Sequence, residues 1–372
     1  MSKNTSEIPF TEMVERELKL GRLAESAIEK VRGVTQDCWQ REVAGKYDWA
    51  FLLASSSITT QAQYITGTFT ANTNDTVGVL SSDASVDSTF TGRQLKVMGN
   101  DVVYDITFLN TTAFTLRQSF QGTTNASGQG YAVFQPFYTL AADFDRFPSD
   151  EGLIKWNGGQ KEAVRDKTYD RNQWLTDYSA SPGIPARLRI VSKDTAGNYR
   201  MELNPPPRDV RTYSYEYFQR PRVLLETTGM LLSLSAGATT VLGLPGKSAF
   251  TEATTGDFLR VDVLGKGQDS SWYRIIAIAN DSSLTLQSAF ANTAITSSAN
   301  YTISRAPDAP PLLHLGVMYG ALRSLMQDQN DPQFQAYQIR FAEVMSDAKA
   351  QFVTRIYNQQ MHIIDEDYMN RR

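Results

Sequence analysis

The sequence predicts an α+β protein in which the N- and C-terminal helices form a helical bundle. Two similar small β-barrel or β-sandwich repeats and a further β-rich part are inserted between those helices. Three observations lead to this prediction. Apolar residues recur with helical spacing near both ends of the chain. Between about 55 and 305 the chain is rich in Thr, Ser, Gly and Asn, and short alternating runs are separated by turn signals. Part of that region also occurs twice.

The composition narrows the possible functions. The chain has 372 residues, is 41% hydrophobic and carries 36 basic and 40 acidic side chains, a net charge of −4. A dedicated nucleic-acid binder usually shows a basic excess. Zinc sites need clustered ligands, and the chain offers only Cys38, His314 and His362. We therefore expect no metal and no cofactor. The first ten residues hold no apolar run and no run could span a bilayer, so we expect neither a secretory signal nor membrane association.

Residues 1–54 are predicted to be the N-terminal helical part. Apolar residues from Phe10 to Val31 follow helical spacing, and Gly33 would end that helix. A second, short helix would begin with Thr35 as its N-cap and end near Gly45.

The second helix leads into an aromatic stretch. Trp39 and Val43 would share one face of that helix, and Trp49 and Phe51 follow it closely in the sequence. We expect Trp39, Trp49 and Phe51 to pack in the core or at subunit contacts, since aromatic side chains bury the largest apolar areas.

Residues 55–139 and 229–306 are predicted to be two copies of one β-module. Both copies contain, in the same order, Thr-Gly, Leu-x-Val, Tyr-x-Ile, Thr-Leu, Phe and Tyr. The offset between copies is 164 at Gly92 and Gly256, 169 at the first shared tyrosine and 170 from there on. This drift places insertions between the second and third shared segments. Each copy is about the size of a small β-barrel.

Residues 140–228 are predicted to be a middle β-rich part. Tyr199–Leu203 and Thr212–Tyr217 alternate like strands. Proline is barred from central strands, so the prolines of this part, for example those at 205–207, mark edges and turns.

Residues 307–357 are predicted to be the C-terminal helical part. Gly316 and Gly320 lie four apart in its first helix. They either allow close approach of a neighbouring backbone or are merely tolerated at about 1 kcal/mol each. Asp331 and Pro332 would start a second helix. That helix carries an apolar stripe, which we expect to be core: Phe334, Tyr337, Phe341, Met345, Ala348, Phe352 and Ile356.

Residues 358–372 are mostly polar and have no core of their own. This segment is either frayed or an arm that docks on a partner. Interspersed apolar residues favour the arm, and they are Met361, Ile363, Ile364, Tyr368 and Met369.

The lack of known catalytic motifs predicts that the chain is not an enzyme and has no catalytic residue. Gly246-Lys247-Ser248 lacks the first glycine of a phosphate loop, because Val241 stands there. No Gly-x-Ser-x-Gly motif occurs, and Cys38 is expected to be a buried, inert thiol. Scattered carboxylates are the only feature compatible with a hydrolase.

The order of several motifs resembles the head-to-tail adaptor (neck, connector or head-completion) proteins of tailed bacteriophages. An N-terminal helix is followed by Cys-Trp-Gln-Arg-Glu-Val-Ala-Gly-Lys-Tyr-Asp-Trp-Ala-Phe-Leu at 38–52. Leu-Asn-Pro-Pro-Pro at 203–207, Tyr-Glu-Tyr-Phe-Gln-Arg-Pro at 215–221 and Leu-Gly-Val-Met-Tyr-Gly-Ala-Leu at 315–322 come next, before the long amphipathic helix. The resemblance covers about half of the chain. The small adaptors lack the two repeated β-modules.

The resemblance implies a structural virion protein in the neck, between head and tail, assembled in the host cytoplasm. Members of the adaptor family form a homo-oligomeric ring, usually dodecameric, beneath the portal protein. The ring extends the DNA channel, and double-stranded DNA passes through it without sequence-specific binding. The resemblance also implies a C-terminal arm that docks into the portal, and a platform on the ring for a tail or nozzle protein.

An alternative follows from the repeated modules. Their Thr, Ser, Tyr and Trp content is also compatible with a carbohydrate- or surface-binding module of a virion or tail. The two functions are compatible with each other on one molecule.

Overall fold

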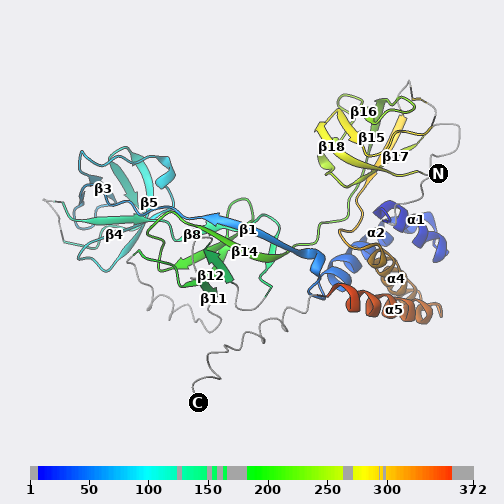
Figure 1. Ribbon diagram of the computed structural model, residues 1–372, viewed down its shortest axis with the longest axis horizontal. Helices are drawn as coiled ribbons and strands as arrows, with labels where there is room; N and C mark the ends of the chain where they lie inside the picture. Colours follow the sequence, from blue (N-terminus) through cyan, green and yellow to red (C-terminus); the bar gives the residue numbers. More distant parts are fainter. Residues whose placement is uncertain are drawn as a thin grey trace, which may run out of the picture. The chain divides into compact units, whose positions relative to one another are not determined.

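The computed structural model describes residues 7–123, 128–148, 153–156, 162–165, 182–262, 271–292, 294–295 and 299–353. It is an α+β structure with several β-sheets (Figure 1). The chain divides into two compact units, each made from two stretches of sequence. The first unit comprises Met1–Leu52 and Pro221–Arg355, and the second comprises Leu53–Arg220 and Ile356–Arg372.

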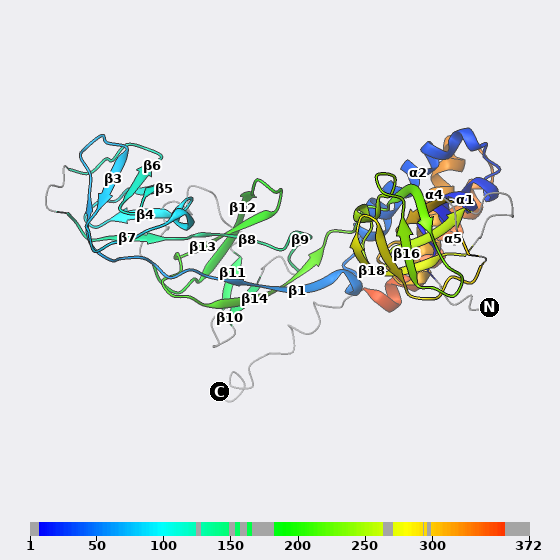
Figure 2. The same cartoon turned by 90° about the horizontal axis from the view of Figure 1, so that it is seen from above.

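The first unit contains the longer helices together with one β-module (Figure 2). Helix α4 contacts α1, α2 and α5. The helical elements of this unit are α1 (Phe10–Leu20), η1 (Glu25–Ala27), α2 (Ile28–Asp37), η2 (Cys38–Ala44), η3 (Ala50–Leu52), η5 (Phe250–Glu252), α4 (Pro311–Asp328) and α5 (Phe334–Phe352).

The predicted helix from Phe10 to Val31 is interrupted. Helix α1 ends at Leu20, Gly21 follows it, and Arg22 has the left-handed φ of 48°. The N–H of Leu23 then donates to the carbonyl of Leu18 at 2.9 Å, which closes the helix end. The prediction of one continuous helix was therefore wrong, because apolar spacing continued across a C-terminal cap.

The predicted stop at Gly33 and start at Thr35 were also wrong. Helix α2 runs through Gly33, and a Cβ at that position would meet nothing within 4 Å. Thr35 lies inside α2, and its hydroxyl donates to the carbonyl of Val31 at 2.8 Å instead of capping a new helix. The helix continues as the π-helix η2 and ends at Gly45, as predicted.

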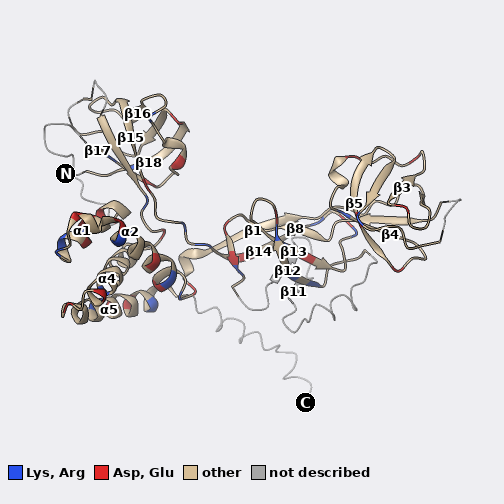
Figure 3. Ribbon diagram, turned by 180° about the vertical axis from the view of Figure 1, so that it is seen from behind, with Lys and Arg blue, Asp and Glu red and all other residues tan. Residues whose placement is uncertain are grey.

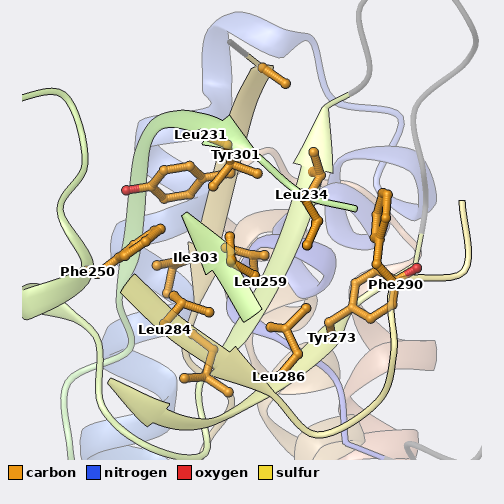
Figure 4. Close-up of a cluster of buried hydrophobic side chains, with 14 of the residues drawn as sticks. Leu231, Leu234, Phe250, Leu259, Tyr273, Leu284, Leu286, Phe290, Tyr301 and Ile303 are labelled. Atoms are coloured by element: carbon orange, nitrogen blue, oxygen red, sulfur yellow. The ribbon is translucent and has the colours of Figure 1, made fainter. Parts of the chain in front are cut away.

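The β-module of the first unit is a closed six-stranded barrel with the strand order β15-β16-β19-β18-β17-β20. Figure 4 shows side chains of Leu231, Leu259 and Ile303 pointing from separate strands into its core. Its strands are β15 (Glu226–Ser233), β16 (Thr240–Gly243), β17 (Phe258–Asp262), β18 (Tyr273–Asn280), β19 (Ser283–Leu286) and β20 (Ala299–Ser304).

The second unit contains a six-stranded module with the equivalent order β2-β3-β6-β5-β4-β7. Phe69 and Gln129 exchange two backbone hydrogen bonds of 2.8 and 2.9 Å, which join β2 to the segment before β7. Its elements are β2 (Phe69–Thr70), β3 (Val77–Leu80), η4 (Ser88–Phe90), β4 (Gln94–Val97), β5 (Val103–Asn110), β6 (Ala113–Leu116) and β7 (Tyr131–Phe134).

Residues of the two copies make the same contacts. The Tyr104 hydroxyl accepts a hydrogen bond from the N–H of Gln121 at 2.9 Å, and its ring lies 5.6 Å from that of Phe120. In the other copy the Tyr273 hydroxyl accepts from Ala291 at 3.3 Å, and its ring lies 5.5 Å from that of Phe290. The repeat seen in the sequence is thus a repeat of side-chain contacts as well as of strand order.

The change of the offset from 169 to 170 corresponds to one extra residue in the second copy, which forms a β-bulge. Strand β18 shifts register against β19 between Ile275 and Ala277, which leaves Ile276 as the extra residue, half exposed. Strand β5 pairs with β6 without a shift at the equivalent Ile106 and Thr107. The bulge lies beyond the hairpin to which the sequence assigned the insertions.

The second unit also contains an eight-stranded sheet with the order β1-β14-β10-β11-β12-β13-β8, and β9 pairs with β14. Neighbouring strands are antiparallel except β11 and β12. The predicted strands at Tyr199 and Thr212 are confirmed. The strands are β1 (Leu53–Thr59), β8 (Phe137–Thr139), β9 (Phe144–Arg146), β10 (Leu153–Trp156), β11 (Glu162–Arg165), β12 (Arg187–Lys193), β13 (Tyr199–Asn204) and β14 (Thr212–Gln219).

The hydrogen bonds of this sheet cross the boundaries drawn from the sequence. Strands β1 and β8 lie almost wholly within the range 55–139, yet they pair with β14 and β13 of the middle part. The sequence boundary near 55 followed a change in composition, whereas strand pairing depends on partners distant in the chain.

Candidate functional site

Trp39 connects the helices of the first unit to the segment that precedes strand β15 of the barrel. Its side chain is fully buried, and its Nε1–H donates to the carbonyl of Arg222 at 2.9 Å. The amide oxygen of Gln36 accepts from the N–H of Leu224 at 2.9 Å, so α2 and η2 hold the segment before β15 at two points. Of the two uses we expected for Trp39, core packing and subunit contact, the structure shows core packing.

Trp49 joins the aromatic stretch after η2 to the end of α5. The indole is fully buried and donates to the carbonyl of Val43 at 2.7 Å. It stacks on the half-buried Phe51 with ring centroids 5.7 Å apart. Trp49 also forms a β-bridge with Val353, the residue that follows α5. The N-terminal aromatic stretch and the C-terminal helix are therefore in direct contact.

Gly320 lies where α4 crosses η2 and α5. A Cβ at this position would lie 2.4 Å from Sγ of Cys38 and 3.0 Å from the Phe341 ring. A Cβ at Gly316 would lie 3.3 Å from Val344. These distances favour close approach over mere tolerance for Gly320, and to a lesser degree for Gly316. Burial also raises the pKa of the Cys38 thiol well above its usual range, so the sulfur stays protonated and packs as an apolar atom.

The described residues of the predicted stripe of α5 face α4, as expected for core, and Ile356 lies outside the described residues. Tyr337 and Phe341 are buried, together with Met345 and Ala348. Phe334 and Phe352, at the two ends, are half-buried. Tyr337 stacks on Tyr319 of α4 with centroids 6.4 Å apart. Helix α5 begins at Phe334, two residues after the predicted Pro332, while a carboxylate oxygen of Asp331 accepts from the N–H of Gln333 at 2.8 Å.

The role of His314 could not be predicted from the sequence. This side chain is fully buried in α4, and its Nδ1 accepts the N–H of Ile8 at 2.8 Å. Its Nε2 lies 3.0 Å from the carbonyl oxygen of Ala309, to which it donates. This pair of bonds requires the neutral ring. Burial lowers the pKa of His314, which also favours the neutral form.

His314 should make the stability of the chain depend on pH. Its folded pKa lies below the ordinary value of about 6.5, so below that pH the unfolded chain binds the proton more readily. We expect the contribution of His314 to the free energy of unfolding to fall, by up to about 1.4 kcal/mol per pH unit, as the pH drops from about 6.5 towards the folded pKa. The raised pKa of Glu17 acts in the opposite direction. The loss is therefore measured by comparing urea unfolding of the wild type and a His314 variant at about pH 7.5 and about pH 5.5.

The matched variant is His314→Gln. It should be less stable than the wild type at the higher pH and should lack this share of the loss at the lower pH. The contribution of His362 is present in both proteins and cancels. An equal loss in both proteins would show that His314 does not cause it.

Glu17 and Thr35 form a second buried polar contact that sequence reasoning missed. Oε2 of Glu17 lies 2.6 Å from the Thr35 hydroxyl, which is also 2.8 Å from the carbonyl oxygen of Val31. Burial raises the pKa of Glu17 well above its usual value, and the contact with Thr35 opposes this more weakly. The Thr35 hydroxyl donates toward both oxygens, Oε2 of Glu17 and the carbonyl oxygen of Val31, and so ties α1 to α2.

The residues predicted for the docking arm, Met361, Ile363, Ile364, Tyr368 and Met369, lie outside the described residues. Both acidic and basic residues occur along the helices of the first unit (Figure 3). Within the described ranges, no group of three or more His, Cys, Asp or Glu side chains is placed to hold a metal ion. No helix among those ranges is long and apolar enough to cross a membrane.

Comparisons with known proteins do not show a family. No protein-family model matches the chain. No curated protein matches it. Two solved structures of translation elongation factor SelB from Methanococcus maripaludis are weakly similar. The apo form is 9% identical to this chain, and the alignment covers 69% of this chain and 64% of the SelB chain with a TM-score of 0.16. The complex with the GTP analogue GppNHp is 10% identical, with coverages of 69% and 63% and a TM-score of 0.15. The chain spans less than two thirds of those structures, and TM-scores this low do not establish a shared fold.

Proposed function

We propose that this chain is the head-to-tail adaptor of a tailed bacteriophage. Its N- and C-terminal helices form one bundle, and twelve subunits form a ring beneath the portal protein. The ring extends the DNA channel and offers a platform to a tail or nozzle protein. The protein is located in the neck of the virion and is assembled in the host cytoplasm.

The observation that carries the proposal is the contact between Trp49 and Val353. It brings the aromatic stretch of the N-terminal part against the end of α5. Both stretches belong to the motif order that resembles the adaptor family. In the sequence the apolar residues proposed for the docking arm come shortly after Val353. A subunit built this way would present the start of its arm next to a rigid aromatic cluster.

The charge of the chain supports the same function. A channel through which DNA passes must not grip phosphates, because clustered basic contacts bind DNA tightly. The net charge is −4, and α1 and α2 carry both signs of charge. Neutral or mixed-sign surfaces would let DNA pass without specific binding.

Binding to portal rings tests the proposal. Purified protein should co-sediment with purified rings of the portal protein from the same phage. Native mass spectrometry of the complex should give as many copies of this chain as of the portal. Failure to co-sediment at any concentration tested would refute the adaptor function.

Deletion of residues 358–372 should leave the subunit folded and weaken portal attachment, because the deleted segment has no core of its own. Thermal unfolding checks the fold, and co-sedimentation measures attachment. A sharper pair of full-length variants replaces Met361, Ile363, Ile364, Tyr368 and Met369 by Ser, or replaces Asn358, Gln359 and Gln360 by Ser. Only the first variant should bind poorly. If the deletion protein binds as well as the whole chain, the segment is not a docking arm.

A further inference from the structure

An open cleft of about 580 Å³ lies in the second unit, between the first β-module and the eight-stranded sheet. Strands β4, β5 and β6 supply one wall, and β8, β12 and β13 supply the other. Its volume falls in the range of ligand-binding pockets. The adaptor proposal makes no use of this cleft.

Arginine dominates the chemistry of the cleft. Arg117 lies on the first wall, and Arg189 and Arg200 lie on the second. The described lining contains a single carboxylate, that of Asp105. The side chain of Arg117 is 83% exposed and lies 3.6 Å from the Asp105 carboxylate, whose other oxygen accepts from the Gln94 amide at 3.1 Å.

The opposite wall holds its arginines in fixed positions. Arg189 is paired at 2.5 Å with the buried carboxylate of Glu202. The Arg200 guanidinium lies over the Phe137 ring, 4.7 Å from its centroid. Among the described residues no carboxylate forms an ion pair with Arg200. A guanidinium that is held by an aromatic ring and has an unused edge is prepared to receive a carboxylate in two hydrogen bonds.

The second copy of the module binds carboxylates of the chain itself through arginines. Arg274 of β18 binds the carboxylate of Glu7 at 3.2 Å, and Arg260 of β17 binds that of Glu15 at 2.8 Å. The first copy has Asp105 and Lys96 at the equivalent positions, so the arginines of its cleft come from other positions.

We propose that the arginine cleft of the second unit binds an acidic peptide segment of a partner protein. Carboxylates of the segment would be held by Arg200 and Arg117. This inference goes beyond the adaptor function and does not depend on it.

Acetylated hexaglutamate is a suitable probe, with acetylated hexaglutamine as its neutral counterpart. Isothermal titration calorimetry on the full chain should show binding of the acidic peptide only, and this binding should weaken as salt is raised. Arg200→Gln and Arg117→Gln should each weaken binding about tenfold, the usual contribution of one charge-assisted hydrogen bond.

Arg208→Gln is the charge-matched control. It lies in the same unit, its side chain is 63% exposed, and it does not line the cleft. Because Arg117 is so exposed, Arg117→Gln remains informative even if Arg200→Gln disturbs folding. Absence of hexaglutamate binding, equal loss in the control, or equal binding of hexaglutamine would overturn the proposal. So would binding of an acidic oligosaccharide such as oligogalacturonate without binding of the peptide.

Discussion

Replacing Gly320 by Ala is expected to lower the free energy of unfolding by about 2–3 kcal/mol. The added methyl would overlap Sγ of Cys38 and would lie 3.0 Å from the Phe341 ring, a tighter distance than most real Cβ contacts. Either α4 must move away from η2 and α5, or both side chains must leave their rotamers. Alanine also favours a helix over glycine by about 1 kcal/mol, so the strain has to exceed that gain. Chemical denaturation measures the difference.

Gly33→Ala is the matched control for this prediction. Gly33 lies inside α2, and a Cβ there meets nothing within 4 Å. We expect this change to stabilise the chain by up to about 1 kcal/mol. Combining Gly320→Ala with Cys38→Ala should restore part of the loss, because the closest clashing atom is removed. If Gly320→Ala stabilises the chain as Gly33→Ala does, the helices do not approach as closely as described.

Trp39→Ala should lower the free energy of unfolding by about 3–5 kcal/mol, the usual cost of truncating a buried aromatic side chain. The indole is fully buried, and its removal leaves a cavity between η2 and the segment before β15. It also leaves the Arg222 carbonyl without this donor. The change should lower the unfolding midpoint in urea, followed by circular dichroism.

Trp39→Phe separates packing from hydrogen bonding. Phenylalanine keeps much of the apolar volume but cannot donate to Arg222, so most of the loss seen with alanine should be absent if packing dominates. A loss as large as that of alanine would assign the effect to the hydrogen bond. An alanine variant as stable as the wild type would contradict the placement of Trp39 in the core.

Helical elements near both ends could be read from the sequence because apolar spacing reports which face is buried. The stripe of α5 is an example, with Tyr337 and Phe341 buried as expected. The boundaries could not be read equally well. The break after Leu20 depends on a left-handed Arg22, and Gly33 resembles a stop signal that α2 does not use.

The repeat was readable because its order of glycine, tyrosine and phenylalanine reflects shared contacts. Gly92 and Gly256 both take positive φ, at 83° and 98°, and both donate to the carbonyl of the equivalent isoleucine. Pairing between distant strands could not be predicted from the sequence. Strand β1 pairs with β14, which is about 150 residues further along the chain, and the residues near Ser55 do not indicate this partner.

The polar contacts inside the helical part were beyond the reach of sequence reasoning. His314 and Ile8 are 306 positions apart, and Glu17 and Thr35 lie on different helices. Glutamate is mostly exposed in proteins and histidine is intermediate in burial, so residue type alone does not mark either side chain as buried. Only the fold brings each of them to a buried partner.

Electron microscopy of this protein on purified portal rings tests the central proposal most directly. We expect a ring of density coaxial with the portal, on the face that receives the tail, with one adaptor subunit for each portal subunit. This ring should be lost when residues 358–372 are deleted. Portal rings that remain bare at saturating concentrations of a folded, full-length protein would refute the adaptor function.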